Sequence, residues 1–104
     1  TLQLLLNMLE FGRDPQEAVE EPRFFSYNFP QSGFPSKYEP GMLRLEGRIS
    51  DETVESLRQK GHTIEMYPDW WEGSSLYCAI TRNPETKVLQ GGADPRCEAY
   101  AVGY

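Results

Sequence analysis

Residues 42–67 read MLRLEGRISDETVESLRQKGHTIEMY, a pattern that predicts a strand, a helix and a second strand in succession. The apolar residues at its start favour a short strand that closes at Gly47. Near its end, Ile64 and Met66 alternate with their neighbours over residues 63–67, as side chains do in a half-buried strand. A helix flanked by strands indicates a fold that mixes both kinds of element in layers.

The helix between these strands carries start and stop signals. Ser50 is a strong N-cap candidate, and the helix is expected over about residues 51–60. Ile49 lies just before the cap and can pack against Val54, a contact that fixes how the chain enters a helix. Gly61 is the residue type that most readily adopts the left-handed conformation found just past a helix end. The helix is therefore expected to stop there.

Two further helices are expected in the first part of the chain. Residues 2–11 are apolar nearly all round, so a helix there is expected to be buried by protein on most sides, with Thr1 as its N-cap. Gly12 fits the position just past the end of that helix. Asp14 then caps a short second helix, which Pro22 ends because it disfavours helical geometry at the residue before it.

Extended segments and one loop complete the expected organisation. Residues 23–29 are rich in aromatic side chains and are expected to be extended. Residues 30–41 contain three prolines, two glycines and two serines, the composition of a surface loop. Residues 76–90 predict a β-hairpin whose turn lies at 83–87. Together these elements predict the α+β fold class within one small domain.

The two cysteines lie in this second half of the chain. Cys78 alternates in step with Leu76 and Ile80, so it is expected to pack with them as a small apolar group. Cys97 lies in the tail, and whether the two cysteines form a disulfide is left open. Because they have no CxxC spacing, they do not indicate a zinc site.

Charge and length exclude several functional classes. Sixteen acidic residues against ten basic residues give a net charge of −6, the wrong sign for binding nucleic-acid phosphates or an anionic membrane surface. The longest apolar stretch, at residues 2–11, is well short of the ~20 residues that a membrane-spanning helix needs. We therefore expect neither nucleic acid nor a membrane as a partner.

Candidate catalytic and metal-binding residues are few. An N-terminal Thr can be a nucleophile whose own amine is the base, but the helix after Thr1 would bury its hydroxyl and supply no oxyanion donors. The capping role of Thr1 is therefore preferred. His62 follows a helix end and has no second His or Cys at ligand spacing. The short second helix is expected to have a solvated acidic face formed by Glu17, Glu20 and Glu21. We assign no catalytic residue, cofactor or metal site to the chain.

Two motifs have both a functional and a structural interpretation. The adjacent Trp70 and Trp71 could stack a ligand beside carboxylates, although covering an edge of the core is the preferred interpretation for such large side chains. The segment GGADPR at residues 91–96 lacks the Lys-Ser/Thr of a phosphate-binding loop. It is expected to be a tight turn in which Asp94 and Arg96 fix each other or nearby backbone.

Four segments together resemble one enzyme family. They are residues 7–24 (NMLEFGRDPQEAVEEPRF), residues 45–62 (LEGRISDETVESLRQKGH), the closing GGADPR at 91–96, and AVGY at 101–104. Their wording, order and spacing resemble the last part of the small subunit of the γ-glutamyltransferase (γ-glutamyltranspeptidase) family. The resemblance covers almost the whole chain, while Phe25 stands where the family often has His after Arg-Phe.

The resemblance implies a fold and a chemistry. Members of the family are N-terminal nucleophile hydrolases, with a four-layer αββα sandwich, and they cleave themselves so that a Thr begins the small subunit. That Thr attacks the γ-glutamyl amide of glutathione-type donors, and the acyl group passes to water or to an acceptor amine. The family nucleophile lies upstream of the segment that matches here, so the resemblance transfers no catalytic residue to this chain.

The leading hypothesis is that residues 1–104 are the C-terminal segment of such an enzyme and form part of its αββα sandwich. Its expected partners are the remainder of the small subunit and the large subunit of the same precursor, with a γ-glutamyl compound as the substrate of the complete enzyme. The isolated segment is expected to be inactive and to self-associate. The alternative is a free-standing binding or interaction module that uses the Trp70/Trp71 loop and the loop at 30–41.

Overall fold

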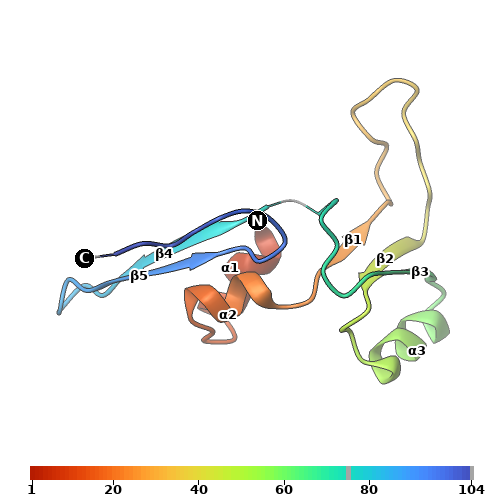
Figure 1. The fold of residues 1–104 in the computed structure, drawn as a ribbon. Coiled ribbons are helices and arrows are strands. Elements are labelled where there is room, and N and C mark those ends of the chain that lie inside the picture. Colours follow the sequence, from red (N-terminus) through yellow and green to blue (C-terminus); the bar gives the residue numbers. More distant parts are fainter. Residues whose placement is uncertain (75, 104) are drawn as a thin grey trace. The chain divides into compact units, whose positions relative to one another are not determined.

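The computed structural model describes residues 1–74 and 76–103 and divides the chain into two compact units (Figure 1). Unit 1 comprises Thr1–Glu21 and Glu72–Tyr104, and unit 2 comprises Pro22–Trp71. The buried apolar side chains gather in two separate clusters, one in each unit.

Unit 1 begins with two short helices, α1 (Leu2–Leu9) and α2 (Pro15–Glu20). Thr1 occupies the N-cap position of α1, but its side chain makes no capping hydrogen bond, so the expected hydroxyl cap is wrong. The signals around α2 are confirmed: the Asp14 carboxylate accepts from the Glu17 backbone N–H at 2.8 Å, and the Glu17 carboxylate accepts from the Asp14 N–H at 3.1 Å. Gly12 has a φ of +66°, as expected past a helix end.

Strands β4 (Cys78–Arg82) and β5 (Leu89–Ala93) form the expected antiparallel hairpin. Ala79 pairs with Gly92, and both are buried. Cys78 and Ile80 lie exposed, so the expectation that Cys78 packs inward is wrong. The cause is α2, whose first turn leaves no room for a side chain at Gly92 and therefore covers the opposite face of the hairpin.

The core of unit 1 is small. It consists of a cluster of buried residues, Leu4, Ala18, Val19 and Ala79, with Met8 and Tyr77 packed against it. Within unit 1, α1 therefore buries one leucine, whereas Leu2 is 70% and Leu9 80% exposed. The all-round burial expected for this helix is not reached within the described residues, where the element that packs closely against α1 is the short helix α2.

Unit 2 confirms the strand, helix and strand predicted from residues 42–67. Its elements are β1 (Phe24–Ser26), β2 (Met42–Glu46), α3 (Asp51–Gln59) and β3 (Thr63–Tyr67). The sheet order is β1-β2-β3, with β1 antiparallel to β2 and β2 parallel to β3. The Ser50 hydroxyl caps α3 by accepting from the Thr53 N–H at 3.3 Å, and Gly61 has a φ of +91°.

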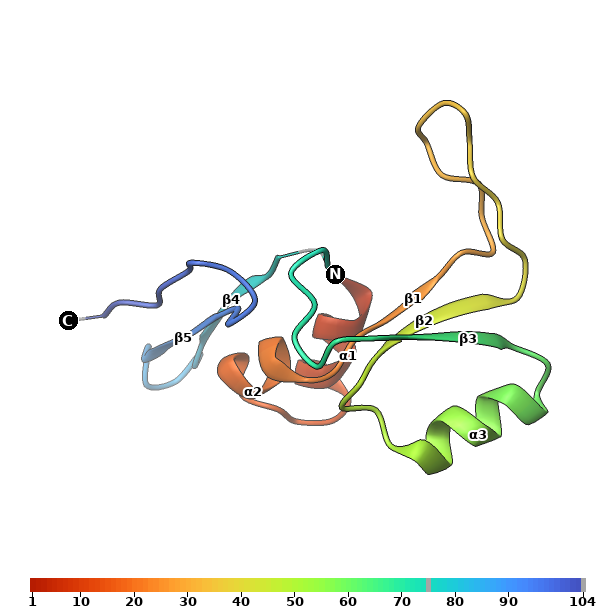
Figure 2. The same cartoon turned by 45° about the vertical axis from the view of Figure 1, so that its right-hand side comes forward.

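Helix α3 lies along one face of this sheet, as Figure 2 shows. The core between them comprises Leu43, Leu45 and Val54, with Ile49, Leu57 and Ile64 packed against it. Ile49 thus packs against the cluster that contains Val54, the residue with which the sequence predicts its contact. Met66 of β3 is 41% exposed and does not belong to this core.

A long connection joins β1 to β2. Residues 30–41 lie outside the helices and strands, and nearly all of them are exposed. The base of this loop is closed by the Asn28 side chain, which accepts from the Gly41 N–H at 2.6 Å, and by the Tyr27 carbonyl, which accepts from the Glu39 N–H at 3.3 Å. None of the helices in the described ranges has the length and apolar character needed to cross a membrane.

Candidate functional site

In unit 1, a polar network joins α2 to β5. The Gln16 side chain donates to the Ala93 carbonyl at 3.0 Å and accepts from the Ala93 N–H at 3.0 Å. It thereby satisfies both backbone groups of the last residue of β5, as a neighbouring strand would. The position of α2 on the hairpin is therefore set by directional hydrogen bonds in addition to apolar packing.

The second part of this network is the buried ion pair of Asp94 and Arg96. The Arg96 Nη1 atom lies 3.1 Å from Asp94 Oδ1, and both side chains are fully buried. Arg96 also donates to the carbonyls of Val19 at 2.9 Å and Glu21 at 3.2 Å, at the C-terminal end of α2. The other carboxylate oxygen of Asp94 accepts from the Tyr77 N–H at 3.1 Å.

This geometry confirms that Asp94 and Arg96 fix each other and nearby backbone. The expected turn is shorter than predicted, however, because Gly91 and Gly92 lie within β5 and pair with Ile80 and Ala79. The two charged groups bind backbone atoms of Tyr77, Val19 and Glu21, so the motif ties the tail to α2 and to the segment that leads into β4. The network is a structural centre of unit 1.

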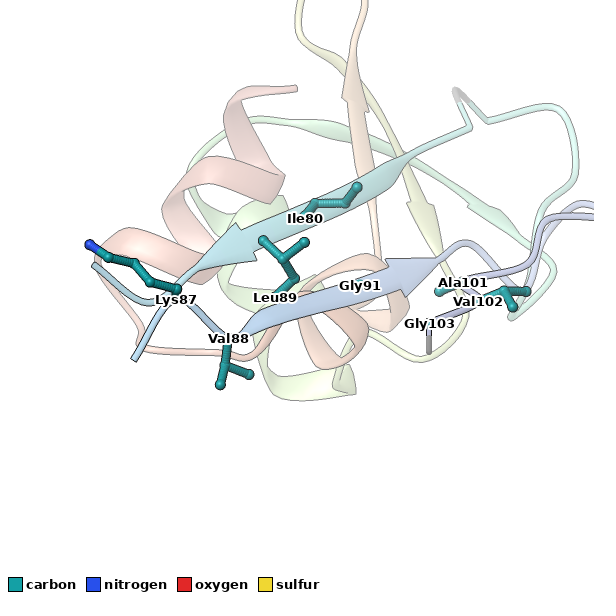
Figure 3. Close-up of a pocket in the computed structure, with 8 residues that line it drawn as sticks. All are labelled: Ile80, Lys87, Val88, Leu89, Gly91, Ala101, Val102 and Gly103. Carbon is teal, nitrogen blue, oxygen red and sulfur yellow. The ribbon is translucent and has the colours of Figure 1, made fainter. Parts of the chain in front are cut away.

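On the outer face of the hairpin lies an apolar hollow of about 710 Å³ (Figure 3). The residues that line it come from both strands and the tail: Ile80, Lys87, Val88, Leu89, Gly91, Ala101, Val102 and Gly103. The ammonium group of Lys87 donates to the backbone carbonyl of Pro84 in the hairpin turn. Apart from Lys87, the side chains that line the hollow are apolar, so this surface is suited to packing against protein.

In unit 2, aromatic and charged side chains gather around Arg44 of β2. The Arg44 guanidinium lies 4.1 Å from the Tyr27 ring centre and 5.7 Å from that of Tyr67. Its Nε atom donates to Glu65 at 2.5 Å, and its Nη2 atom lies 3.4 Å from Glu39. The hydrogen bond with Glu65 is the main cause that raises the pKa of Arg44. Two carboxylates thus already neutralise this cation.

The two tryptophans have different surroundings. The Trp71 ring lies 4.1 Å from the Tyr67 ring centre and 5.3 Å from that of Phe25, and it is partly buried. The same crowding desolvates the Tyr67 phenol and raises its pKa. Trp70 is 41% exposed, and the Arg48 guanidinium lies 3.5 Å from its ring centre. The preferred interpretation, that the pair covers the edge of a core, therefore fits Trp71 but not Trp70.

The remaining candidates are dispersed. The Thr1 amino group donates to the Tyr77 hydroxyl at 2.9 Å, and the His62 backbone N–H donates to the Leu57 carbonyl at the end of α3. Cys78 and Cys97 are both free thiols, and the Cys97 Sγ donates to the Asp94 carbonyl at 3.4 Å. In the described parts of the chain, no three His, Cys, Asp or Glu side chains are grouped as metal ligands are.

Sequence reasoning missed the charged residues of β2. Arg44 and Glu46 alternate with Leu43 and Leu45, which lie in the core beneath α3. This alternation indicates that the two charged side chains share the opposite face of the sheet. The sequence could have shown that shared face, but not the aromatic partners, which come from distant positions.

Comparison with known proteins identifies the chain's relatives. The Gamma-glutamyltranspeptidase family model matches residues 1–104. The chain is 37% identical over 100 residues to the Glutathione hydrolase-like YwrD proenzyme of Bacillus subtilis (strain 168). The match covers 96% of this chain and 18% of that protein. It is also 33% identical over 90 residues to the Oxamate amidohydrolase proenzyme of Klebsiella pneumoniae subsp. pneumoniae. That match covers 86% of this chain and 16% of that protein. The chain thus spans less than a fifth of these relatives.

Solved structures give the same result. The structure of LmbA2991HD matches with a TM-score of 0.88 and 31% identity, over 99% of this chain and 18% of that one. Gamma-glutamyltranspeptidase from Pseudomonas nitroreducens, complexed with L-DON, matches with a TM-score of 0.72 and 21% identity, over 99% of this chain and 47% of that one. These matches confirm the α+β class and an N-terminal nucleophile hydrolase type of fold. Because the family model matches all of residues 1–104, the chain belongs to the gamma-glutamyltranspeptidase family.

Proposed function

We propose that residues 1–104 are the C-terminal segment of the small subunit of an enzyme that hydrolyses or transfers γ-glutamyl groups. The observation that carries this proposal is the family match over residues 1–104, in a chain that spans only 18% of a proenzyme relative. The nucleophile of such an enzyme is an N-terminal Thr upstream of this chain. The match also favours the enzyme over the alternative binding module built on the Trp70/Trp71 loop.

The proposed reaction is acyl transfer. The Thr hydroxyl adds to the γ-glutamyl carbonyl, its proton passes through the α-amine to the leaving nitrogen, and the amide C–N bond breaks to leave an ester. Water or an amine then attacks the ester, which releases glutamate or a new γ-glutamyl amide and restores the hydroxyl. The residues of this chain take no part in these bonds, and they support the site through the elements that they position.

Unit 1 supplies surfaces suited to the rest of such an enzyme. The exposed side of α1 and the outer face of the hairpin are both apolar: Leu2, Leu5, Leu6, Leu9, Ile80, Val88 and Leu89. A two-stranded hairpin is marginally stable by itself and gains stability when further strands and helices pack against it. The partners that we propose for these faces are the remainder of the small subunit and the large subunit.

The activity test uses a polypeptide extended upstream to the length of the relatives. We expect it to cleave itself into two subunits and to release the aniline from a γ-glutamyl anilide, while the 104-residue chain alone releases none. Mass spectrometry of the subunits and absorbance of the released amine provide the two measurements. A cleaved, folded protein that leaves the γ-glutamyl anilide intact would refute the proposed substrate class.

A second candidate substrate is a small monoamide of the oxamate type. It is favoured by the 33% identity with the Oxamate amidohydrolase proenzyme. The same mature protein should then release ammonia from oxamate, measured with a coupled ammonia assay, with little turnover of the γ-glutamyl anilide. The ratio of the two kcat/KM values decides between the substrates, because both reactions would use the same nucleophile.

The apolar faces also predict self-association of the isolated chain. Leu9 is 80% and Ile80 76% exposed, and large exposed apolar side chains of this kind mark surfaces that associate with protein. Sedimentation velocity over a concentration series should reveal oligomers that the double substitution Leu9→Glu and Ile80→Lys reduces. The control is Gln59→Glu, on the exposed side of α3. A chain that stays monomeric at every concentration, or a control that acts equally, would contradict the prediction.

A further inference from the structure

We infer that the turn Glu46-Gly47-Arg48 is a clamp that holds together the two ends of unit 2. The chain enters unit 2 at Pro22 and leaves it at Trp71. Glu46 ends β2, and its side chain is 0% exposed. Its Oε2 atom accepts from the Arg23 backbone N–H at 3.0 Å, and its Oε1 atom accepts from the Trp71 N–H at 3.2 Å. One carboxylate thus binds both the entry and the exit of the unit.

A carboxylate is the group that this position requires. A buried charge is costly unless hydrogen bonds and an opposite charge compensate it. Here the two oxygens accept from backbone donors of two segments that are far apart in the sequence, and Arg48 Nη2 lies 3.5 Å from Oε2. Glutamine would have the same shape, but its NH₂ group would face one of the two N–H donors and repel it.

The next two residues hold the exit segment. A Cβ atom at Gly47 would overlap the Asp69 carboxylate, which would have to move aside, and would lie 3.3 Å from the Tyr67 backbone carbonyl, so glycine allows the closest approach of these segments. The Arg48 Nε atom donates to the Asp69 carbonyl at 3.0 Å. The Arg48 guanidinium also lies 3.5 Å from the centre of the Trp70 ring.

Three consecutive residues, 46–48, therefore fix three consecutive residues, 69–71. The Glu46 carboxylate adds the entry segment to this contact, beside the backbone hydrogen bond in which the Glu46 N–H donates to the Arg23 carbonyl at 3.0 Å. The clamp also gives each tryptophan its place: Trp70 on Arg48, and Trp71 beside Tyr67 and Phe25. This role as a positioning device is independent of the proposed enzymatic activity and substrate.

Hydrogen exchange, measured on the mature polypeptide extended upstream to the length of the relatives, tests the clamp. In the Glu46→Gln variant, the Arg23 and Trp71 amides should both exchange about tenfold faster or more. Both amides donate to the Glu46 carboxylate, and the substitution replaces these charge-assisted hydrogen bonds with one weaker bond and one repulsive contact. Amides in the β4–β5 hairpin should keep their rates. The matched control is Glu55→Gln, whose side chain is exposed on α3 and which should change neither amide.

A second variant separates the clamp from general loosening of the fold. Arg48→Met removes the contacts with Asp69 and Trp70 and the 3.5 Å contact with Glu46, but it leaves both backbone hydrogen bonds of the Glu46 carboxylate. Trp emission should therefore shift to the red while the Arg23 amide stays protected. If Glu46→Gln does not fold, this variant alone decides. The inference is overturned if Glu46→Gln affects only one of the two amides or all amides of unit 2 equally. It is likewise overturned if Arg48→Met exposes the Arg23 amide.

Discussion

Replacing Gly92 with alanine should lower the free energy of unfolding by about 1–3 kcal/mol, the usual cost of adding atoms to a tightly packed site. A Cβ atom at Gly92 would overlap the backbone carbonyl of Pro15 and lie 2.7 Å from the Gln16 backbone nitrogen. These atoms belong to the first turn of α2, which the Asp14 capping box and the proline ring hold in place. Backbone so constrained cannot move aside as the end of a flexible side chain could.

The adjacent Gly91 supplies a matched control. A Cβ atom there would meet the Ala101 side chain at 3.2 Å, in the tail that follows the hairpin, and no backbone atom. Gly91→Ala should therefore change the unfolding free energy by less than about 0.5 kcal/mol. Urea denaturation followed by circular dichroism compares the two variants. Equal losses of stability would show that close packing between α2 and β5 is not the cause.

The local signals of the sequence predict helix ends well. Asp14, Ser50 and Gly61 act within a few residues of their own positions, and the structure shows each of them in the expected conformation. Capping depends on hydrogen bonds between neighbours in the chain, so it does not require knowledge of the tertiary fold. This explains why α2 and α3 begin and end where the sequence indicates.

The buried face of the hairpin could not be predicted in the same way. Alternation shows that Cys78 and Ile80 share one face and that Ala79 lies on the other, but it does not say which face is covered. That choice depends on α2, which packs on the Ala79 side because Gly92 leaves room for its backbone. The sequence favours burial of the larger side chains, Cys78 and Ile80, whereas the structure buries the small residues Ala79 and Gly92.

The long-range partners of the buried charged residues could not be predicted from the sequence either. The pairing of Asp94 with Arg96 is local and was predictable, whereas their contacts with Val19 and Tyr77 join positions far apart in the sequence. The clamp around Glu46 depends in the same way on backbone donors from both ends of unit 2. A single sequence contains no distance information of this kind, so the partners of buried charges appear only in the structure.

Substituting Arg96 with methionine should cost about 3–5 kcal/mol, the range found when one partner of a buried ion pair is removed. The Asp94 carboxylate would remain fully buried without its cation, and the Val19 and Glu21 carbonyls would lose the donor that ends α2. Arg96→Lys should be less destabilising than Arg96→Met but still less stable than the unchanged chain, because one ammonium group cannot make all the hydrogen bonds of the planar guanidinium group. Chemical denaturation of the purified chain measures both variants.

A control and a double variant show whether the pair itself carries the effect. Arg58 is 51% exposed and lies 3.9 Å from Glu55, so Arg58→Met should change stability by no more than about 0.5 kcal/mol. Combining Arg96→Met with Asp94→Asn removes the stranded charge, and the double variant should lose less stability than the sum of the single losses. Strict additivity would contradict this expectation. It would mean that Arg96 stabilises unit 1 through the α2 carbonyls alone and that Asp94 acts through the Tyr77 N–H, with no coupling between the charges.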